Sequence, residues 1–163
     1  MTVYPIARID TLDPQQTADL AVVLARHLRA GDTLLLDGPI GAGKTHFARA
    51  LIRAAQGPDG DKDIPSPTFT LVQTYQTPTC DIWHADLYRL TDVQEVMELG
   101  LDDAFESAIC LIEWPDRLGD LAPAAALRLT LTVQGDTARQ IVIEGAADWS
   151  ARLASVLPRP KIS

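Results

Sequence analysis

A glycine-rich segment between an apolar run and a helical pattern constrains this chain more than any other feature. Residues 38–45 read GPIGAGKT, which fits the pattern G-x-x-x-x-G-K-[ST]. The three leucines at 34–36, just before it, are typical of a buried strand. Apolar residues then recur at helical spacing over 47–55. The sequence therefore predicts a strand, a tight turn and a helix in succession, which is the local structure of an α/β fold.

The residue types in this segment suit the binding of phosphate groups. Glycines have no Cβ, so backbone N–H groups can turn toward a ligand, and these groups bind phosphate oxygens together with the N-terminus of the following helix. The ammonium of Lys44 would reach the β- and γ-phosphates, and the hydroxyl of Thr45 would bind Mg²⁺. We expect ATP with Mg²⁺ to contact Gly38, Gly41, Ala42, Gly43, Lys44, Thr45 and His46. The alternative is a strand-to-helix turn in which Lys and Thr follow the glycines by chance.

The remaining patterns predict a mixed sheet. Capping boxes begin helices at Asp13 and Thr91, and glycines end them at Gly31 and Gly100. Strands are expected at 33–36, 69–75, 81–88 and 108–112, an antiparallel hairpin at 127–133 and 139–143, and a last helix at 148–157. We expect a single domain over residues 1–163 with a P-loop NTPase-like fold, an α/β three-layer sandwich with a mixed parallel/antiparallel sheet.

Two acidic residues, one just after a predicted strand and one within another, are candidates for the chemistry. Glu113 follows the apolar strand 108–112, where proteins with such a loop place a carboxylate near the metal ion; the alternative is a solvated strand end. Strand alternation puts His84 and Asp86 on one face. Asp86 acts near the γ-phosphate, or the two residues are a polar pair at a strand edge. A zinc site of Cys80, His84 and Asp86 lacks a fourth ligand with suitable spacing.

A loop rich in turn residues precedes Thr68. Residues 57–67 contain three prolines, two glycines and three aspartates, a composition that predicts a mobile loop. In nucleotide hydrolases, the hydroxyl of a threonine in such a loop senses Mg²⁺ or the γ-phosphate. Thr68 is therefore either a nucleotide switch or part of an ordinary loop.

Charge and cysteine content limit the classes of function. The net charge is −8, which argues against tight direct binding of a nucleic-acid backbone. The two cysteines, Cys80 and Cys110, form no CxxC pair, so we expect reduced, buried thiols rather than a disulfide framework. No apolar stretch approaches the roughly 20 residues of a membrane span, and the N-terminus lacks the pattern of a signal peptide. We therefore expect a cytoplasmic protein without membrane contact.

Five motifs follow one another along the chain: GAGKT at 41–45, SPTFTLV at 66–72, HADLYRL at 84–90, ELG at 98–100 and LIEWP at 111–115. Together they resemble the TsaE (formerly YjeE) family over roughly residues 13–139. The resemblance implies a bacterial ATPase of tRNA threonylcarbamoyladenosine biosynthesis. It also implies two partners, the TsaD and TsaB proteins, whose complex modifies the adenosine beside the anticodon. This chain would then contact tRNA only indirectly, through that complex.

The resemblance also implies roles for individual residues. Thr68 would be the switch threonine and Asp86 an essential carboxylate. One departure is Pro39-Ile40, where the family more often has an acidic residue and Leu, but these residues precede the amides expected to bind phosphate. Carried over by motif, the catalytic residues would be Lys44, Thr68, Asp86 and Glu113, the Mg²⁺ ligands Thr45 and Glu113, and further nucleotide contacts Pro14, Trp114 and Gly135.

Three other classes of protein share parts of this pattern. Residues 116–119 fit the D-x-x-G motif of a GTPase. However, a GTPase of that type selects guanine through an N-K-x-D segment, and the chain contains no asparagine. A small-molecule kinase usually has an arginine-rich lid, and residues 57–67 contain no arginine. A non-catalytic assembly module would bind ATP as a structural ligand, and measured turnover separates it from an ATPase.

Overall fold

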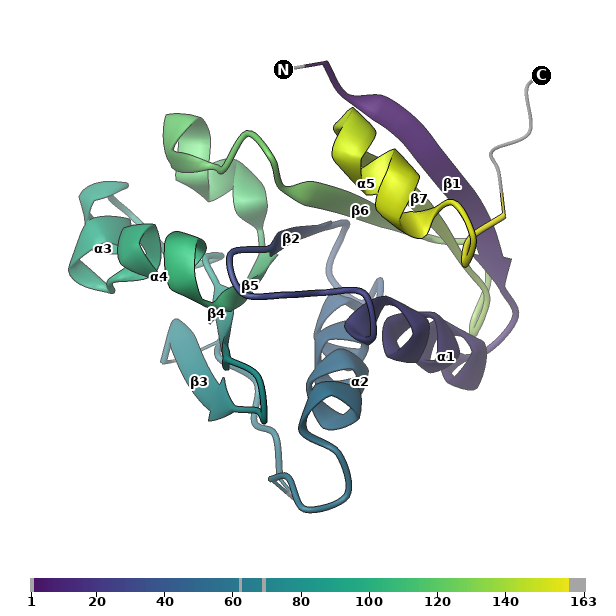
Figure 1. Cartoon of the computed structure of the whole chain (residues 1–163), viewed down its shortest axis with the longest axis horizontal. Coiled ribbons are helices and arrows are strands. Elements are labelled where there is room, and N and C mark those ends of the chain that lie inside the picture. The colour runs from purple at the N-terminus through teal and green to yellow at the C-terminus, as the bar shows by residue number, and fades with distance from the viewer. Residues whose placement is uncertain (1, 62, 69, 159–163) are drawn as a thin grey trace.

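Over residues 2–61, 63–68 and 70–158, the computed structural model shows one seven-stranded sheet with helices packed on its faces (Figure 1). The strands are β1 (Tyr4–Thr11), β2 (Thr33–Asp37), β3 (Val72–Gln76), β4 (Asp81–Asp86), β5 (Ile109–Glu113), β6 (Leu127–Val133) and β7 (Arg139–Gly145). The helices are α1 (Pro14–Ala25), α2 (Lys44–Gln56), α3 (Gln94–Glu98), α4 (Leu101–Ser107), α5 (Ala147–Leu153) and the 3-10 helix η1 (Pro115–Leu121). No helix within these residues has the length and hydropathy that a membrane span requires.

Parallel strands form the centre of the sheet and antiparallel pairs form its two sides. The strand order is β1-β7-β6-β2-β5-β4-β3. β2 is parallel to β5 and β6, and β4 is parallel to β5, whereas β1–β7, β6–β7 and β3–β4 are antiparallel. The predicted mixed sheet and the predicted hairpin are confirmed. Because the carboxyl ends of parallel strands meet at one edge, the ends of β2, β5 and β4 lie together.

The helices form two layers, one on each face of the sheet. Within β2, Leu34 and Leu36 pack in the apolar cluster that contains α1, α2 and α5. Leu35 packs in the second cluster, with α3, α4 and η1, because successive side chains of a strand point to opposite faces. In Figure 1, α1 and α2 lie side by side, and α3 and α4 lie together on the other side of the view. The predicted three-layer sandwich is confirmed.

The start of α1 follows the predicted capping box. Asp13 Oδ1 accepts from the Gln16 N–H at 2.9 Å, and the Gln16 side chain accepts from the N–H of the residue before the cap at 2.8 Å. The predicted end at Gly31 is wrong, because α1 stops at Ala25 and a turn leads to β2. The helical spacing in the sequence continues beyond the helix because Leu28 still packs against the core.

The predicted capping box at Thr91 is wrong, because α3 begins only at Gln94 and its cap residue, Val93, makes no side-chain hydrogen bond. Thr91 lies before the helix, and its Oγ1 donates to Glu95 Oε1 at 2.7 Å. Gly100 follows α3 with a φ of 85°, a conformation that favours glycine. The chain then enters α4 directly. The sequence patterns do not predict α4, β1 or η1.

Strand β3 begins later than the sequence predicts, at Val72. Leu71 has a φ of 66°, and its N–H donates to the carbonyl of Pro67 at 2.7 Å. A turn therefore precedes the strand. Phe69, at which the predicted strand starts, lies outside the described residues.

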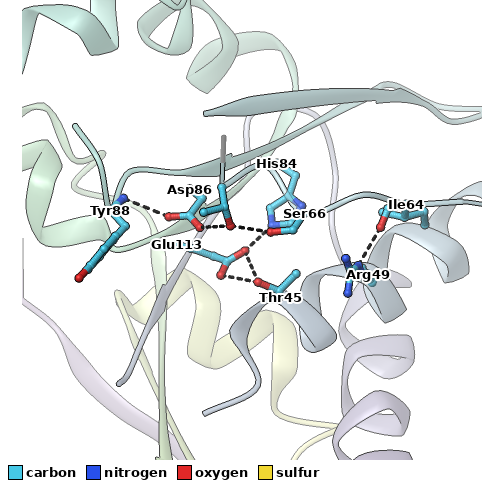
Figure 2. Close-up of polar contacts among 9 residues, drawn as sticks. Thr45, Arg49, Ile64, Ser66, His84, Asp86, Tyr88 and Glu113 are labelled. Atoms are coloured by element: carbon cyan, nitrogen blue, oxygen red, sulfur yellow. Dashed lines mark hydrogen bonds and ion pairs between the residues drawn. The ribbon is translucent and has the colours of Figure 1, made fainter. Parts of the chain in front are cut away.

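Residues 57–67 form the predicted loop, which contains no helix or strand in its described part. Ile64 at its centre is only 2% exposed, and its carbonyl accepts from Arg49 Nε on α2 at 2.7 Å (Figure 2). A buried side chain and a charged donor thus fix one point of the loop to α2. The mobility of the loop stays a prediction.

Both cysteines are free thiols. Cys110 is buried in β5, and burial raises the pKa of its thiol to about 12. Cys80 is half-buried in the turn before β4. The predicted burial is therefore confirmed for Cys110, whereas Cys80 is partly accessible.

Candidate functional site

The glycine-rich loop joins β2 to α2 at the edge where β2, β5 and β4 end. Gly38 has a φ of 141°, and a Cβ at this position would lie 2.4 Å from the carbonyl oxygen of Leu131, so glycine is required. Gly43 has a φ of 101° just before α2. The Ala42 N–H donates to the Pro39 carbonyl at 3.1 Å and closes the turn. The loop leads into the first turn of α2, whose N–H groups have no intrahelical partner.

A pocket of about 410 Å³ opens beside this loop. It brings together residues from segments far apart in the sequence, and these include most of the predicted site. Gly38 and Ala42, expected to contact phosphate, are not part of the lining. The described residues that line it are Ile40, Gly41, Gly43, Lys44, Thr45, His46, Thr68, Asp86, Tyr88, Glu113 and Trp114.

Glu113, at the end of β5, is the centre of a buried polar cluster (Figure 2). The residue is 2% exposed, and its carboxylate oxygens accept from Thr45 Oγ1 at 2.8 and 3.0 Å. His84 Nε2 lies 2.7 Å from Glu113 Oε2. Because a carboxylate only accepts, His84 donates through Nε2–H. Thr45 and Glu113, both expected to be Mg²⁺ ligands, are therefore neighbours in space. The contact of His84 with Glu113 is not predicted from strand alternation.

Asp86 is the second buried carboxylate of the pocket. Its Cα is paired with that of Glu113 between β4 and β5. Asp86 Oδ2 accepts from Thr68 Oγ1 at 3.2 Å, and Ser66 Oγ lies 2.8 Å from the Thr68 hydroxyl. Asp86 Oδ1 accepts from the Tyr88 N–H at 3.0 Å. This last bond turns the chain, so β4 ends at Asp86 and not at residue 88 as predicted.

Lys44 is buried although it carries an ammonium group. Its Nζ donates to the Gly38 carbonyl and lies 3.6 Å from the centroid of the Trp114 ring. Burial lowers the pKa of Lys44, and the nearby carboxylates of Glu113 and Asp86 oppose this shift. Lys44 thus lines the same pocket as both carboxylates.

An aromatic wall closes one side of the pocket. Trp114 follows β5 with a φ of 58°, which turns the chain away from the strand direction. Its ring centroid lies 5.0 Å from that of Tyr88. Trp114 is a predicted site residue, whereas Tyr88 stands in a family motif without a predicted role.

A smaller pocket of about 180 Å³ also adjoins the loop. It shares Gly43 and His46 with the larger pocket, and His46 Nε2 lies 2.9 Å from the carbonyl of Pro14. The predicted residue Pro14 lines it, but Gly135 does not, although its neighbour Asp136 does. Its described lining residues are Pro14, Thr17, Ala42, Gly43, His46, Asp136, Thr137 and Arg139.

The alternative zinc site receives no support. In the part of the chain that the structure describes, no three His, Cys, Asp or Glu side chains form a cluster that could hold a metal ion. Cys80 precedes β4, whereas His84 and Asp86 lie toward its other end. The hydroxyl of Thr45 and the carboxylate of Glu113 instead lie next to each other, and both are oxygen ligands of the kind that Mg²⁺ prefers.

The fold and the site together define an α/β protein of P-loop NTPase-like architecture. A glycine-rich loop, a buried lysine and two buried carboxylates meet where its parallel strands end. The sequence profile of "Threonylcarbamoyl adenosine biosynthesis protein TsaE" matches residues 11–141, and the chain belongs to this family.

Individual relatives agree with the family match. The chain is 38% identical to a protein of Rickettsia bellii named tRNA threonylcarbamoyladenosine biosynthesis protein TsaE, over 77% of this chain and 85% of the relative. It is 32% identical to the Bacillus subtilis protein of the same name, over 91% and 92% of the two chains. The crystal structure of Bacillus subtilis YdiB superimposes with a TM-score of 0.74 at 26% identity, over 95% of each chain. The resemblance to the TsaE family is confirmed.

Proposed function

We propose that this protein is a Mg²⁺-dependent ATPase that acts in tRNA threonylcarbamoyladenosine biosynthesis together with a TsaB–TsaD complex. The relatives from Rickettsia bellii and Bacillus subtilis are named for this modification. The observation that carries the ATPase part is the convergence of the glycine-rich loop, Thr45 and Glu113 on one pocket.

Lys44 and the first turn of α2 are the proposed phosphate-binding groups. The Trp114 ring lies against the Lys44 ammonium, an arrangement stabilised by the negative face of the aromatic ring. The side chain is therefore already directed into the pocket. On phosphate binding, Nζ exchanges the Gly38 carbonyl for phosphate oxygens, which form shorter and stronger charge-assisted hydrogen bonds.

Thr45 and Glu113 are the proposed Mg²⁺ ligands. Mg²⁺ is usually held by one or two protein oxygens, while substrate phosphates and water complete its coordination. The Thr45 hydroxyl and the Glu113 carboxylate already converge at 2.8 Å. When bound, Mg²⁺ would neutralise charge that develops on the β- and γ-phosphates. His84 keeps the carboxylate of Glu113 in place through its Nε2–H.

Asp86 and Thr68 act at the γ-phosphate end in this proposal. Both oxygens of Asp86 accept hydrogen bonds, from Thr68 and from the Tyr88 N–H, so the orientation of the carboxylate is fixed. A fixed carboxylate can orient the water that attacks the γ-phosphate. Thr68 follows the loop 57–67, and its hydroxyl gives that loop a direct contact with the catalytic carboxylate.

The smaller pocket is the proposed site of the base. It lies beside the glycine-rich loop, next to the pocket proposed for the phosphates. Pro14 and His46 line it, and Gly135 belongs to the turn that supplies its wall. Trp114 is separated from this pocket and lies against Lys44, so its place beside the nucleotide is at the phosphate end.

We expect slow ATP hydrolysis by the isolated protein and faster hydrolysis when TsaB and TsaD are added. Among the described residues that line the larger pocket, Lys44 is the only lysine or arginine. A cation supplied by a neighbouring protein raises phosphoryl-transfer rates by about 10³-fold or more in other enzymes. Steady-state phosphate release, measured with and without a purified TsaB–TsaD complex, is expected to rise by at least about tenfold.

The same preparation tests the expected indirect role of tRNA. The 22 Asp and Glu outnumber the 14 Lys and Arg and give a net charge of −8, which repels a phosphate backbone. The isolated protein is therefore expected to bind tRNA more weakly than about 1 µM at physiological salt. Fast turnover that the partners leave unchanged, or tight tRNA binding by the isolated chain, would contradict the proposal.

Radiolabelled ATP separates the proposed ATPase from the two remaining alternatives. Release of free labelled phosphate is the expected result. Label transferred to a small molecule indicates a kinase. Tight ATP binding without turnover, in the presence of the partners, indicates an assembly module that uses ATP as a structural ligand.

A further inference from the structure

The side chain of Arg139, at the start of β7, connects two segments that no strand pairing joins. Nε donates to the Ala42 carbonyl and Nη2 to the Gly41 carbonyl, each at 3.1 Å. Nη1 donates to the carbonyl of Gly135 at 3.0 Å, and also to those of Asp136 and Ala138. The first two carbonyls belong to the glycine-rich loop and the other three to the turn between β6 and β7.

The guanidinium group suits this connection. Its donors lie in one rigid plane, so it fixes two acceptor groups relative to each other, whereas the single ammonium of a lysine does not. The two segments are far apart in the sequence, since Ala42 and Arg139 are 97 positions apart. Within the described residues all five acceptors are backbone carbonyls, so Arg139 holds backbone geometry rather than forming an ion pair.

Further polar contacts complete a ring of contacts around the smaller pocket. Thr137 Oγ1 donates to the Leu12 carbonyl at 2.8 Å, which ties the turn to the start of α1. His46 Nε2 lies 2.9 Å from the Pro14 carbonyl, which ties the start of α1 to α2. Arg139 supplies the contact between the turn and the glycine-rich loop. Side-chain contacts thereby connect the three segments that line the pocket: the turn between β6 and β7, the start of α1, and the glycine-rich loop with α2.

We propose that Arg139 is a positioning residue that couples occupancy of the smaller pocket by a nucleobase to the geometry of the loop that binds phosphate. This inference rests on the proposed function. A base in the smaller pocket contacts the turn at Asp136 and Thr137, and Arg139 transmits the position of that turn to the carbonyls of Gly41 and Ala42. The base and the triphosphate of ATP therefore strengthen each other's binding, a coupling between two subsites of one ligand.

The test compares ATP with inorganic tripolyphosphate, which has no base. Calorimetry in the presence of Mg²⁺ gives the Kd of each ligand for the wild type and for Arg139→Met. The wild type is expected to bind ATP more tightly than tripolyphosphate. In the variant, the ratio of the tripolyphosphate Kd to the ATP Kd is expected to fall by about tenfold. Arg139→Lys keeps the charge and the aliphatic stem, so it is expected to fold and to lose the preference as well. Arg8→Met, which removes an exposed arginine from β1, is the matched control and should keep it.

The possible outcomes separate this inference from the proposed function. Equal weakening of ATP and tripolyphosphate in the Arg139 variants, or an unchanged preference in Arg139→Lys, would overturn the coupling while the ATP site stands. A wild type that binds ATP no better than tripolyphosphate would also overturn it. A wild type that binds neither ligand would refute the proposed function itself. Thermal unfolding of each variant shows whether the fold is intact. If Arg139→Met is unfolded, the preference of Arg139→Lys for ATP over tripolyphosphate tests the coupling.

Discussion

Replacing Lys44 with alanine is expected to raise the Kd for ATP by about 100-fold or more. Lys44 lines the pocket with its ammonium 3.6 Å from the centroid of the Trp114 ring, and no other lysine or arginine lines this pocket among the described residues. Loss of hydrogen bonds from a charged donor costs roughly 3 kcal/mol, and each tenfold change in Kd corresponds to about 1.4 kcal/mol. Calorimetry with Mg-ATP measures the effect.

Two further variants isolate the contribution of the charge. Lys44→Met keeps an unbranched apolar side chain against Trp114 and should lose the same affinity as the alanine variant. Arg53→Ala removes an exposed cation from the last turn of the same helix and should leave the Kd unchanged. ATP affinity that survives both Lys44 substitutions would remove this residue from the proposed site.

Replacing Glu113 with glutamine is expected to lower the rate of ATP hydrolysis by about 100-fold or more while ATP still binds. The amide has nearly the same volume and can still accept from Thr45, so the polar cluster around His84 is disturbed little. It lacks the negative charge that a Mg²⁺ ligand supplies, and the position of the metal governs the chemical step. Backbone amides of the loop, which the substitution spares, retain most of the phosphate affinity.

Single-turnover phosphate release under saturating Mg-ATP separates binding from chemistry for this variant. Asp120→Asn is the matched control, because it neutralises an exposed carboxylate on η1 and should turn over at the wild-type rate. Wild-type turnover of Glu113→Gln at saturating Mg²⁺ would show that this carboxylate does not position the metal.

The parts of the site that depend on local sequence were predictable. The glycine-rich loop requires glycine wherever φ is positive, and Gly38 also meets the carbonyl of Leu131 at close range. Glu113 follows an apolar strand, where the sequence predicts a carboxylate of the site. Asp86 was expected inside a strand 81–88, whereas β4 ends earlier, at Asp86, which lies beside Glu113. The cap at Asp13 and the hairpin of β6 and β7 follow from patterns within a few neighbouring residues.

The parts that depend on pairing between distant segments were not predictable in the same way. His84 contacts Glu113 because β4 lies beside β5, an adjacency that alternation within β4 does not reveal. Arg139 reaches the glycine-rich loop because the hairpin lies beside β2. Strand β1 has polar and apolar residues without a clear alternation, and its position is set by β7 rather than by its own pattern.

The position of β1 has a consequence for how the chain is made. In the described sheet β1 pairs with β7 alone, and the paired residues Asp10 and Gln140 are 130 positions apart. At about 5–20 residues per second, a ribosome needs roughly 7 to 26 s to synthesise that interval. During this time the first strand has no partner strand, and its apolar residues Ile6 and Ala7, buried in the finished protein, are open to chaperones or to other chains. A nascent chain that stops before β7 therefore lacks two strands of the sheet, because without β7 the strand β1 has no partner.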